Sequence, residues 1–114
     1  MQNKPRSKGE IVFDLKDKDG NRVVWYEDSY NHHRNDRHFD THNLFNTVKR
    51  AIKTPQLKFK EKERNCKHFY YMVRMDKKGT KQLYMEVIIN YNTVPAVILS
   101  AHLTSDTKRA TISL

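Results

Sequence analysis

The chain has 114 residues with 22 Lys and Arg against 13 Asp and Glu, so its formal charge at pH 7 is +9. An apolar fraction of 37% suffices for one small core, and only three glycines and three prolines exclude a fibrous or low-complexity chain. No run approaches the ~20 apolar residues of a membrane span, and a single cysteine excludes an internal disulfide or a multi-cysteine zinc site. Beyond solubility, the charge favours a polyanionic partner: nucleic acid first, then an acidic protein, then an anionic membrane surface.

The N-terminal part of the chain predicts a β-hairpin behind a polar lead-in. Residues 1–9 are polar and basic, so we expect them to be disordered and to contain no secretory signal. One domain is expected over residues 10–114. The apolar residues Ile11, Phe13 and Leu15 recur at every second position, and the β-prone run Val23 to Tyr26 follows an Asp19-Gly20 turn signal.

Two helices are expected next. Ser29 can cap a first helix over residues 30–39, which should be short or irregular because its residues have mediocre helix propensity. Thr41 can cap a second helix, whose apolar residues recur on one face between Leu44 and Ile52. Pro55 should end that helix.

The rest of the chain reads as β-structure. A short strand at Leu57–Lys60 precedes three longer stretches, over residues 68–75, 83–91 and 96–103, that should form an antiparallel meander. We therefore predict an α+β fold in which an N-terminal hairpin and two helices pack on a C-terminal antiparallel sheet, a meander of three to four strands.

The alternation within these strands predicts which residues share a face. The core face should take the alternate residues that begin at Phe69, Leu83 and Val97, beneath the second helix. The other face then has two cross-strand rows: Arg74, Tyr84 and His102 in one, and Met72, Glu86 and Ser100 in the next. Such a set is unusual for a face that is only solvated, although an ordinary wet face remains an alternative.

Four of the six histidines fall in one short window, together with arginines: His32, His33, Arg34, Arg37, His38 and His42. A metal site is one hypothesis, because His38 and His42 have i, i+4 spacing, but His-Glu-x-x-His is absent. A solvated polar helix is the second. The third is an acid–base or phosphate-binding site, in which His titrates near neutrality and Arg clamps a phosphate.

The third hypothesis gains from a resemblance. It is carried by His33-x-x-x-Arg37-His38, the amphipathic helix ending in Lys53-x-Pro55, the Tyr-rich strand with Arg74 and the closing strand over residues 97–102. Together, over residues 22–104, these resemble the nuclease superfamily that groups barnase, EndoU, the tRNase colicins and RelE, in its phage and polymorphic-toxin branch.

The resemblance implies a metal-independent endoribonuclease that needs no cofactor and cleaves RNA, such as tRNA, by 2′-hydroxyl attack to a 2′,3′-cyclic phosphate. It implies a bacterial toxin domain with a cytoplasmic site of action, delivered within a secreted or phage-associated protein and paired with an acidic immunity protein or antitoxin. It places His33, Arg37 and His38 on the helical side of the site, and Arg74 and His102 on the sheet.

The roles follow from the chemistry of RNA cleavage. His33 or His38 would form an acid–base pair with His102. Arg74 and Arg37 would hold the phosphate, because a guanidinium stays charged and binds oxygens in pairs.

Further residues would support this site. Ser100 and Thr104 would orient the phosphate, and Tyr70 or Tyr84 would stack on a base. Glu86 would replace a histidine as the base if burial raised its pKa. The lysines expected to track the RNA backbone are Lys58, Lys60, Lys67, Lys77 and Lys78.

Two alternatives use the same residues without catalysis. In a nucleic-acid-binding module, histidine substitutions would leave function intact, while Lys and Arg substitutions would weaken binding broadly. In an interaction protein for an acidic partner, high salt would abolish partner binding and RNA would not bind at all.

Overall fold

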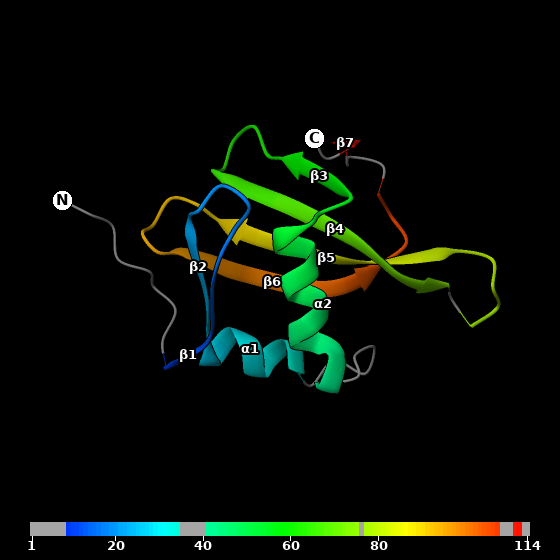
Figure 1. The fold of residues 1–114 in the computed structure, drawn as a ribbon, viewed down its shortest axis with the longest axis horizontal. Coiled ribbons are helices and arrows are strands. Elements are labelled where there is room, and N and C mark those ends of the chain that lie inside the picture. Colours follow the sequence, from blue (N-terminus) through cyan, green and yellow to red (C-terminus); the bar gives the residue numbers. More distant parts are fainter. Residues whose placement is uncertain (1–8, 35–40, 76, 108–110, 113–114) are drawn as a thin grey trace.

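The computed structural model of this chain describes residues 9–34, 41–75, 77–107 and 111–112. The predicted lead-in therefore lies outside the described residues, except for Gly9. The fold is α+β, as predicted, with two helices and one seven-stranded sheet (Figure 1). In chain order the elements are β1 (Ile11–Lys16), β2 (Arg22–Tyr26), α1 (Glu27–Arg34), α2 (Thr41–Lys53), β3 (Leu57–Lys60), β4 (Cys66–Met75), β5 (Gln82–Asn90), β6 (Ala96–Thr104) and β7 (Thr111–Ile112).

The sheet is larger than the predicted meander and is connected differently. Its strand order is β1-β2-β6-β5-β4-β3-β7, and all neighbours are antiparallel except β2 and β6, which are parallel. The N-terminal hairpin thus extends the sheet along β6 instead of packing on it. The prediction of three to four antiparallel strands is wrong because a local hairpin signal does not say which edge the hairpin joins.

The first hairpin turn confirms its sequence signal. Gly20 adopts a left-handed φ of 87°, which a residue without Cβ does without strain. The Asp17 carboxylate accepts the backbone N–H groups of Asp19 and Asn21 at 2.9 and 2.8 Å. The Tyr91 hydroxyl also donates to it at 2.8 Å, which ties the turn to the end of β5.

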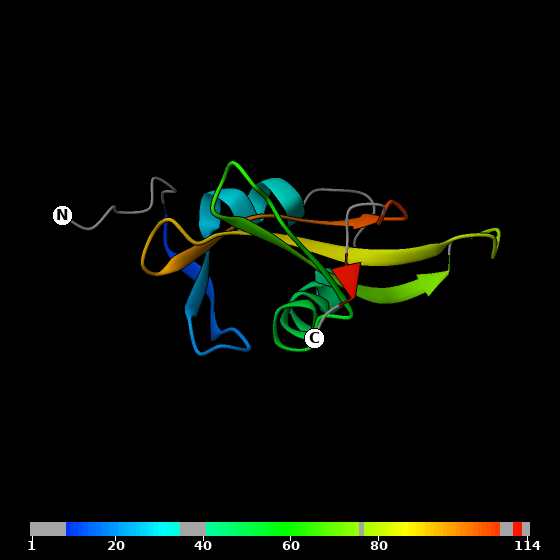
Figure 2. The ribbon, with the colours of Figure 1, turned by 90° about the horizontal axis from the view of Figure 1, so that it is seen from above.

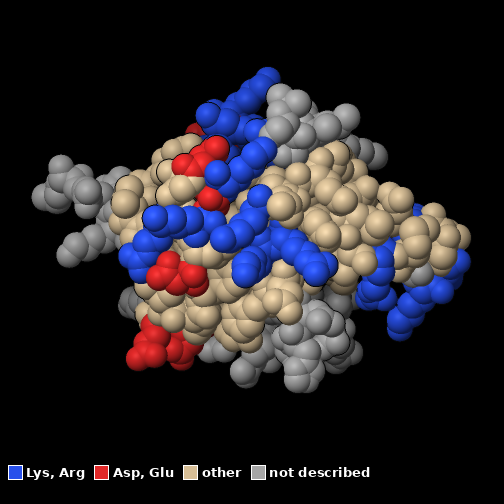
Figure 3. Space-filling model, viewed as in Figure 1, with Lys and Arg blue, Asp and Glu red and all other residues tan. Residues whose placement is uncertain are grey.

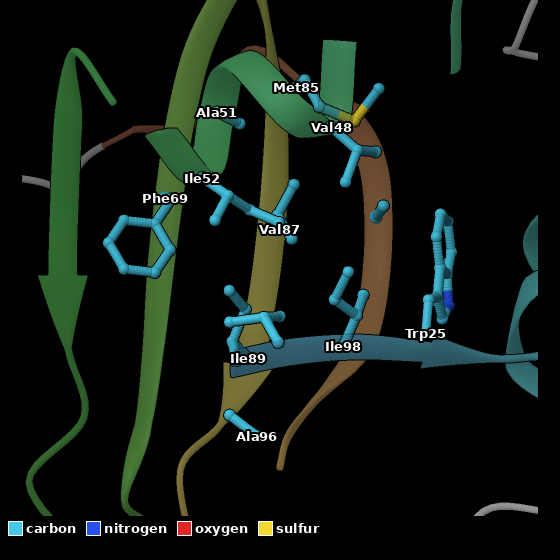
Figure 4. Close-up of a cluster of buried hydrophobic side chains, with 12 residues drawn as sticks. Trp25, Val48, Ala51, Ile52, Phe69, Met85, Val87, Ile89, Ala96 and Ile98 are labelled. Carbon is cyan, nitrogen blue, oxygen red and sulfur yellow. The ribbon is translucent and has the colours of Figure 1, made fainter. Parts of the chain in front are cut away.

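Helix α2 supplies the core on one face of the sheet. It begins at Thr41 and ends two residues before Pro55, as predicted. Its buried residues Val48, Ala51 and Ile52 point toward the strands. Figure 4 shows them with the buried side chains of four strands: Trp25, Phe69, Met85, Val87, Ile89, Ala96 and Ile98. We call this side of the sheet the α2 face and the opposite side the site face.

Helix α1 lies next to β2 and β6. Viewed from above, it lies on the other side of β6 from α2 (Figure 2). It begins at Glu27, so Ser29 is inside the helix and is not its predicted cap. The Ser29 hydroxyl instead accepts the Trp25 indole N–H and donates to the Leu99 carbonyl, both at 3.2 Å, and so ties α1 to β6.

Two β-bulges change the predicted register. β4 has an extra residue at Val73 and β6 has one at Leu99. Past the second bulge Ile98 lies in the core, where Val97 and Leu99 were expected. The predicted cross-strand pairs are wrong by two residues, one from each hairpin turn and one from each bulge. The structure pairs Tyr70, Glu86 and His102 in one row, and Met72, Tyr84 and Thr104 in the next.

Candidate functional site

A row of polar side chains crosses three strands of the site face. Tyr70 of β4, Glu86 of β5 and His102 of β6 are direct cross-strand neighbours. Opposite residues on antiparallel strands share a face, with their Cβ atoms about 5 Å apart. Tyr70 and Glu86 are only 3% and 9% exposed, whereas the His102 side chain is 34% exposed. The row therefore holds a buried carboxylate beside one imidazole that solvent and ligands can reach.

Glu86 accepts hydrogen bonds from three side chains. Its Oε1 accepts His102 Nε2–H at 2.7 Å. Its Oε2 accepts His68 Nδ1–H at 2.9 Å and also the Tyr70 hydroxyl. Burial by itself would raise the pKa of Glu86, but the bonds from His102, Tyr70 and His68 outweigh it and hold the pKa at about 2. The raised pKa expected of Glu86 is wrong, and the carboxylate is ionised at neutral pH.

The same carboxylate is linked to the loop between β3 and β4. His68 Nε2–H donates to Glu61 at 2.5 Å, and the Arg64 guanidinium holds both oxygens of Glu61 at 2.7 Å. The Arg64 and His68 bonds lower the pKa of Glu61 to about 2. Both ring nitrogens of His68 thus face carboxylate oxygens, which only accept hydrogen bonds. Side-chain contacts thus link Arg64, Glu61, His68 and Glu86 in one row, which we call the charge chain.

Ser100 is the second partner of His102. Its Oγ lies 3.1 Å from His102 Nδ1, so the imidazole is held between a hydroxyl and the Glu86 carboxylate. Thr104 follows on the same strand face, and its hydroxyl accepts the Asp106 N–H at 3.0 Å. Because Nε2 of His102 is bonded to the Glu86 carboxylate, Nδ1, which faces Ser100, is the ring nitrogen through which His102 can exchange a proton with a ligand.

No family model, curated protein or solved structure matches this chain. Among the described residues, no group of three or more His, Cys, Asp or Glu is arranged to hold a metal ion. Neither described helix is long and apolar enough to cross a membrane.

The structure brings together only some of the predicted catalytic residues. Arg37 and His38 lie outside the described residues, and His33 is in the last turn of α1, where only the backbone is described. Arg74 lies past the β4 bulge and pairs with Leu83. Leu83 lies on the same face of β5 as Met85 and Val87, which belong to the core. Arg74 therefore lies on the opposite face from His102, and its predicted place in the His102 row is wrong.

The two tyrosines differ in what they can do. Tyr70 is buried and its hydroxyl is bonded to Glu86, so the prediction that its ring stacks on a base is wrong. Tyr84 is partly exposed and lies one row from Glu86 and His102 on the site face.

The predicted backbone-tracking lysines fall into two groups. Lys58 pairs with the core residue Phe69 and Lys60 with Lys67, so these three lysines lie on the α2 face. Figure 3 shows a band of basic side chains over that face and another group at the end of the β4–β5 hairpin, which carries Lys77 and Lys78. Only the second group belongs to the hairpin that carries Tyr84.

His68 and Glu61 were missed as site residues. Strand alternation already places His68 on the same face as Tyr70, two positions away, and this signal could have found it. Glu61 gave no such signal, because its contact with His68 depends on how the β3–β4 loop folds back.

Proposed function

We propose that this protein is a metal-independent endoribonuclease that cleaves RNA by 2′-hydroxyl attack and leaves a 2′,3′-cyclic phosphate. The observation that carries the proposal is the partly exposed His102 imidazole held between the Glu86 carboxylate and the Ser100 hydroxyl. Histidine suits proton transfer near pH 7. A carboxylate on its far nitrogen fixes the ring and stabilises the imidazolium that forms when it takes a proton.

Each residue then has a distinct part. His102 exchanges a proton with the 2′-hydroxyl or the leaving 5′-oxygen through Nδ1. Glu86 is a positioning residue, because it acts through His102. Ser100, beside Nδ1, hydrogen-bonds a phosphate oxygen. In this proposal His33 or His38 is the second acid–base group, and Arg37 binds the phosphate. The hydrogen bond from Ser29 to the Leu99 carbonyl supports this assignment, because it ties α1 to β6, the strand of His102.

The biological setting is part of the same proposal. The +9 charge and the resemblance to toxin nucleases support a toxin domain that acts on RNA in the cytoplasm, delivered within a secreted or phage-associated protein. The same charge supports an acidic immunity protein or antitoxin as its protein partner.

The test is cleavage of total RNA and of tRNA in the presence of EDTA. We expect wild-type protein to cut and to leave cyclic phosphate ends, and His102→Ala to cut at least ~100-fold more slowly, the low end for loss of a general acid or base. Lys53→Gln, an exposed change on α2, is the matched control and should cut normally. Intact RNA with wild-type protein, or normal cutting by a folded His102→Ala variant, would contradict the proposal.

A further inference from the structure

A polar pocket opens on the site face next to the Tyr70–Glu86–His102 row. Its volume is about 640 Å³, and it is lined by Lys81, Gln82, Tyr84, Ser105, Asp106 and Thr107. Tyr84 pairs with Thr104, one row beyond the pair Glu86 and His102. Alternate residues of a strand lie about 6.5–7 Å apart, so the pocket begins one such step from the acid–base group.

The lining has the groups that hold a nucleotide. The Tyr84 ring offers a surface for stacking, and its hydroxyl donates to the Gln82 amide oxygen at 3.0 Å, which fixes the ring. Lys81 supplies a cation for a phosphate, while Gln82 and Asp106 supply polar groups for a base edge. The volume is in the range of about 300–1,000 Å³ that is usual for small-ligand pockets.

The pocket lies at the foot of the β4–β5 hairpin. We call residues 72–75 and 77–84 the arm, because they extend well beyond both helices (Figures 1 and 2). Met72, Val73 and Met75 of the arm are 37%, 38% and 43% exposed, and exposed lysines occupy its end. Cations that follow the backbone, together with flat or apolar groups that receive bases, are what proteins present to single-stranded nucleic acid.

We propose that this pocket binds the nucleotide next to the cleaved bond of a single-stranded RNA, with its base stacked on Tyr84 and a phosphate held by Lys81. The arm then guides the strand from its lysines to His102. The inference rests on the proposed ribonuclease function for its biological purpose, but binding alone tests it.

The experiment measures binding of a short fluorescent single-stranded oligonucleotide with 2′-deoxy sugars, which a 2′-hydroxyl mechanism cannot cleave. We expect Tyr84→Ala to weaken binding about tenfold, the usual effect of losing one stacked base, and Tyr84→Phe to bind normally. Lys81→Gln should weaken binding and reduce the slope of log affinity against log salt by about one. The control Lys53→Gln should bind as wild type does.

Other results would overturn the inference. If Tyr84→Ala binds the oligonucleotide as tightly as wild type does, the pocket is not a nucleotide site. The same follows if the wild-type protein does not bind the oligonucleotide at all, whether or not it cuts RNA. If poly-glutamate binds in a Tyr84-dependent way and the oligonucleotide does not, the pocket docks an acidic protein instead. If oligonucleotide binding depends on Tyr84 but His102→Ala still cuts RNA, the catalytic proposal fails and the pocket assignment stands.

Discussion

The surroundings of Glu86 decide what this residue can do. A half-buried carboxylate in an apolar site is a candidate general base, because burial raises its pKa. Here three donors surround the carboxylate, and its pKa falls to about 2 instead. A group that holds its proton so weakly cannot act as an acid near neutral pH and is a poor base. Its contribution is to orient His102, whose Nε2 it holds at 2.7 Å.

His68→Gln tests the charge chain at the residue scale. Glu61 and Glu86 have pKa values lowered from 4.5 to about 2, so each stabilises the fold above pH ~4.5 and loses this contribution as the pH falls toward 2. Without the hydrogen bonds from the His68 ring, the pKa values of both carboxyl groups should move back toward 4.5. The free energy of unfolding should therefore be lower in the variant at neutral pH and should depend less on pH below 4.5.

Urea unfolding at several pH values measures this effect. Arg22→Gln is a suitable control, because it removes a solvent-exposed partner of Asp14 on another part of the sheet, and exposed ion pairs contribute little. If His68→Gln and wild type lose stability in parallel as the pH falls, the charge chain does not set these pKa values.

At the scale of elements, much of the fold could be predicted, because local signals decide helices and strands. The Asp19-Gly20 turn, the apolar stripe that ends before Pro55, and the alternation in β4–β6 are all present in the structure. A bulge is different, since pairing between two strands decides it, and Val73 and Leu99 look like ordinary strand residues. Each bulge reverses the faces beyond it. Tyr70, Glu86 and His102 lie on one face, but their pairing differs from the predicted rows by two residues, one from the hairpin turn and one from the bulge.

Ile52→Ala tests how strongly α2 holds the sheet. Ile52 is fully buried between α2 and the strands, so its truncation leaves a cavity and should lower the free energy of unfolding by about 2–5 kcal/mol. Lys53→Gln, at the next and exposed position, should change it by no more than ~0.5 kcal/mol. Urea denaturation of both variants provides the comparison. A loss below 1 kcal/mol for Ile52→Ala would mean that α2 is not the principal cover of this core.

On the face that Figure 3 shows, the basic side chains of the described residues form two groups. One band lies over α2 and its neighbouring strands, and the other group lies at the end of the arm (Figure 3). The candidate site is on the face opposite α2, and the molecule is 22 Å thick along its shortest axis, the direction of view in Figure 1. At physiological salt the Debye length is about 8 Å. Charges on the α2 face are therefore largely screened from a strand bound at His102.

Two double variants with the same loss of charge test this separation. Lys77→Gln with Lys78→Gln neutralises the end of the arm, and Lys58→Gln with Lys60→Gln neutralises two lysines of the α2 face. At physiological salt, the arm variant should bind the oligonucleotide more weakly and lose about one to two units of salt slope, one for each phosphate contact removed. The α2-face variant should bind almost as wild type does.

In low salt, where the Debye length reaches about 30 Å, both variants should associate with the oligonucleotide more slowly than wild type, because long-range attraction depends on total charge. Equal losses of affinity in both variants at physiological salt would mean that the bound strand crosses both surfaces. A greater loss of affinity in the α2-face variant would mean that the nucleic-acid interface lies away from His102.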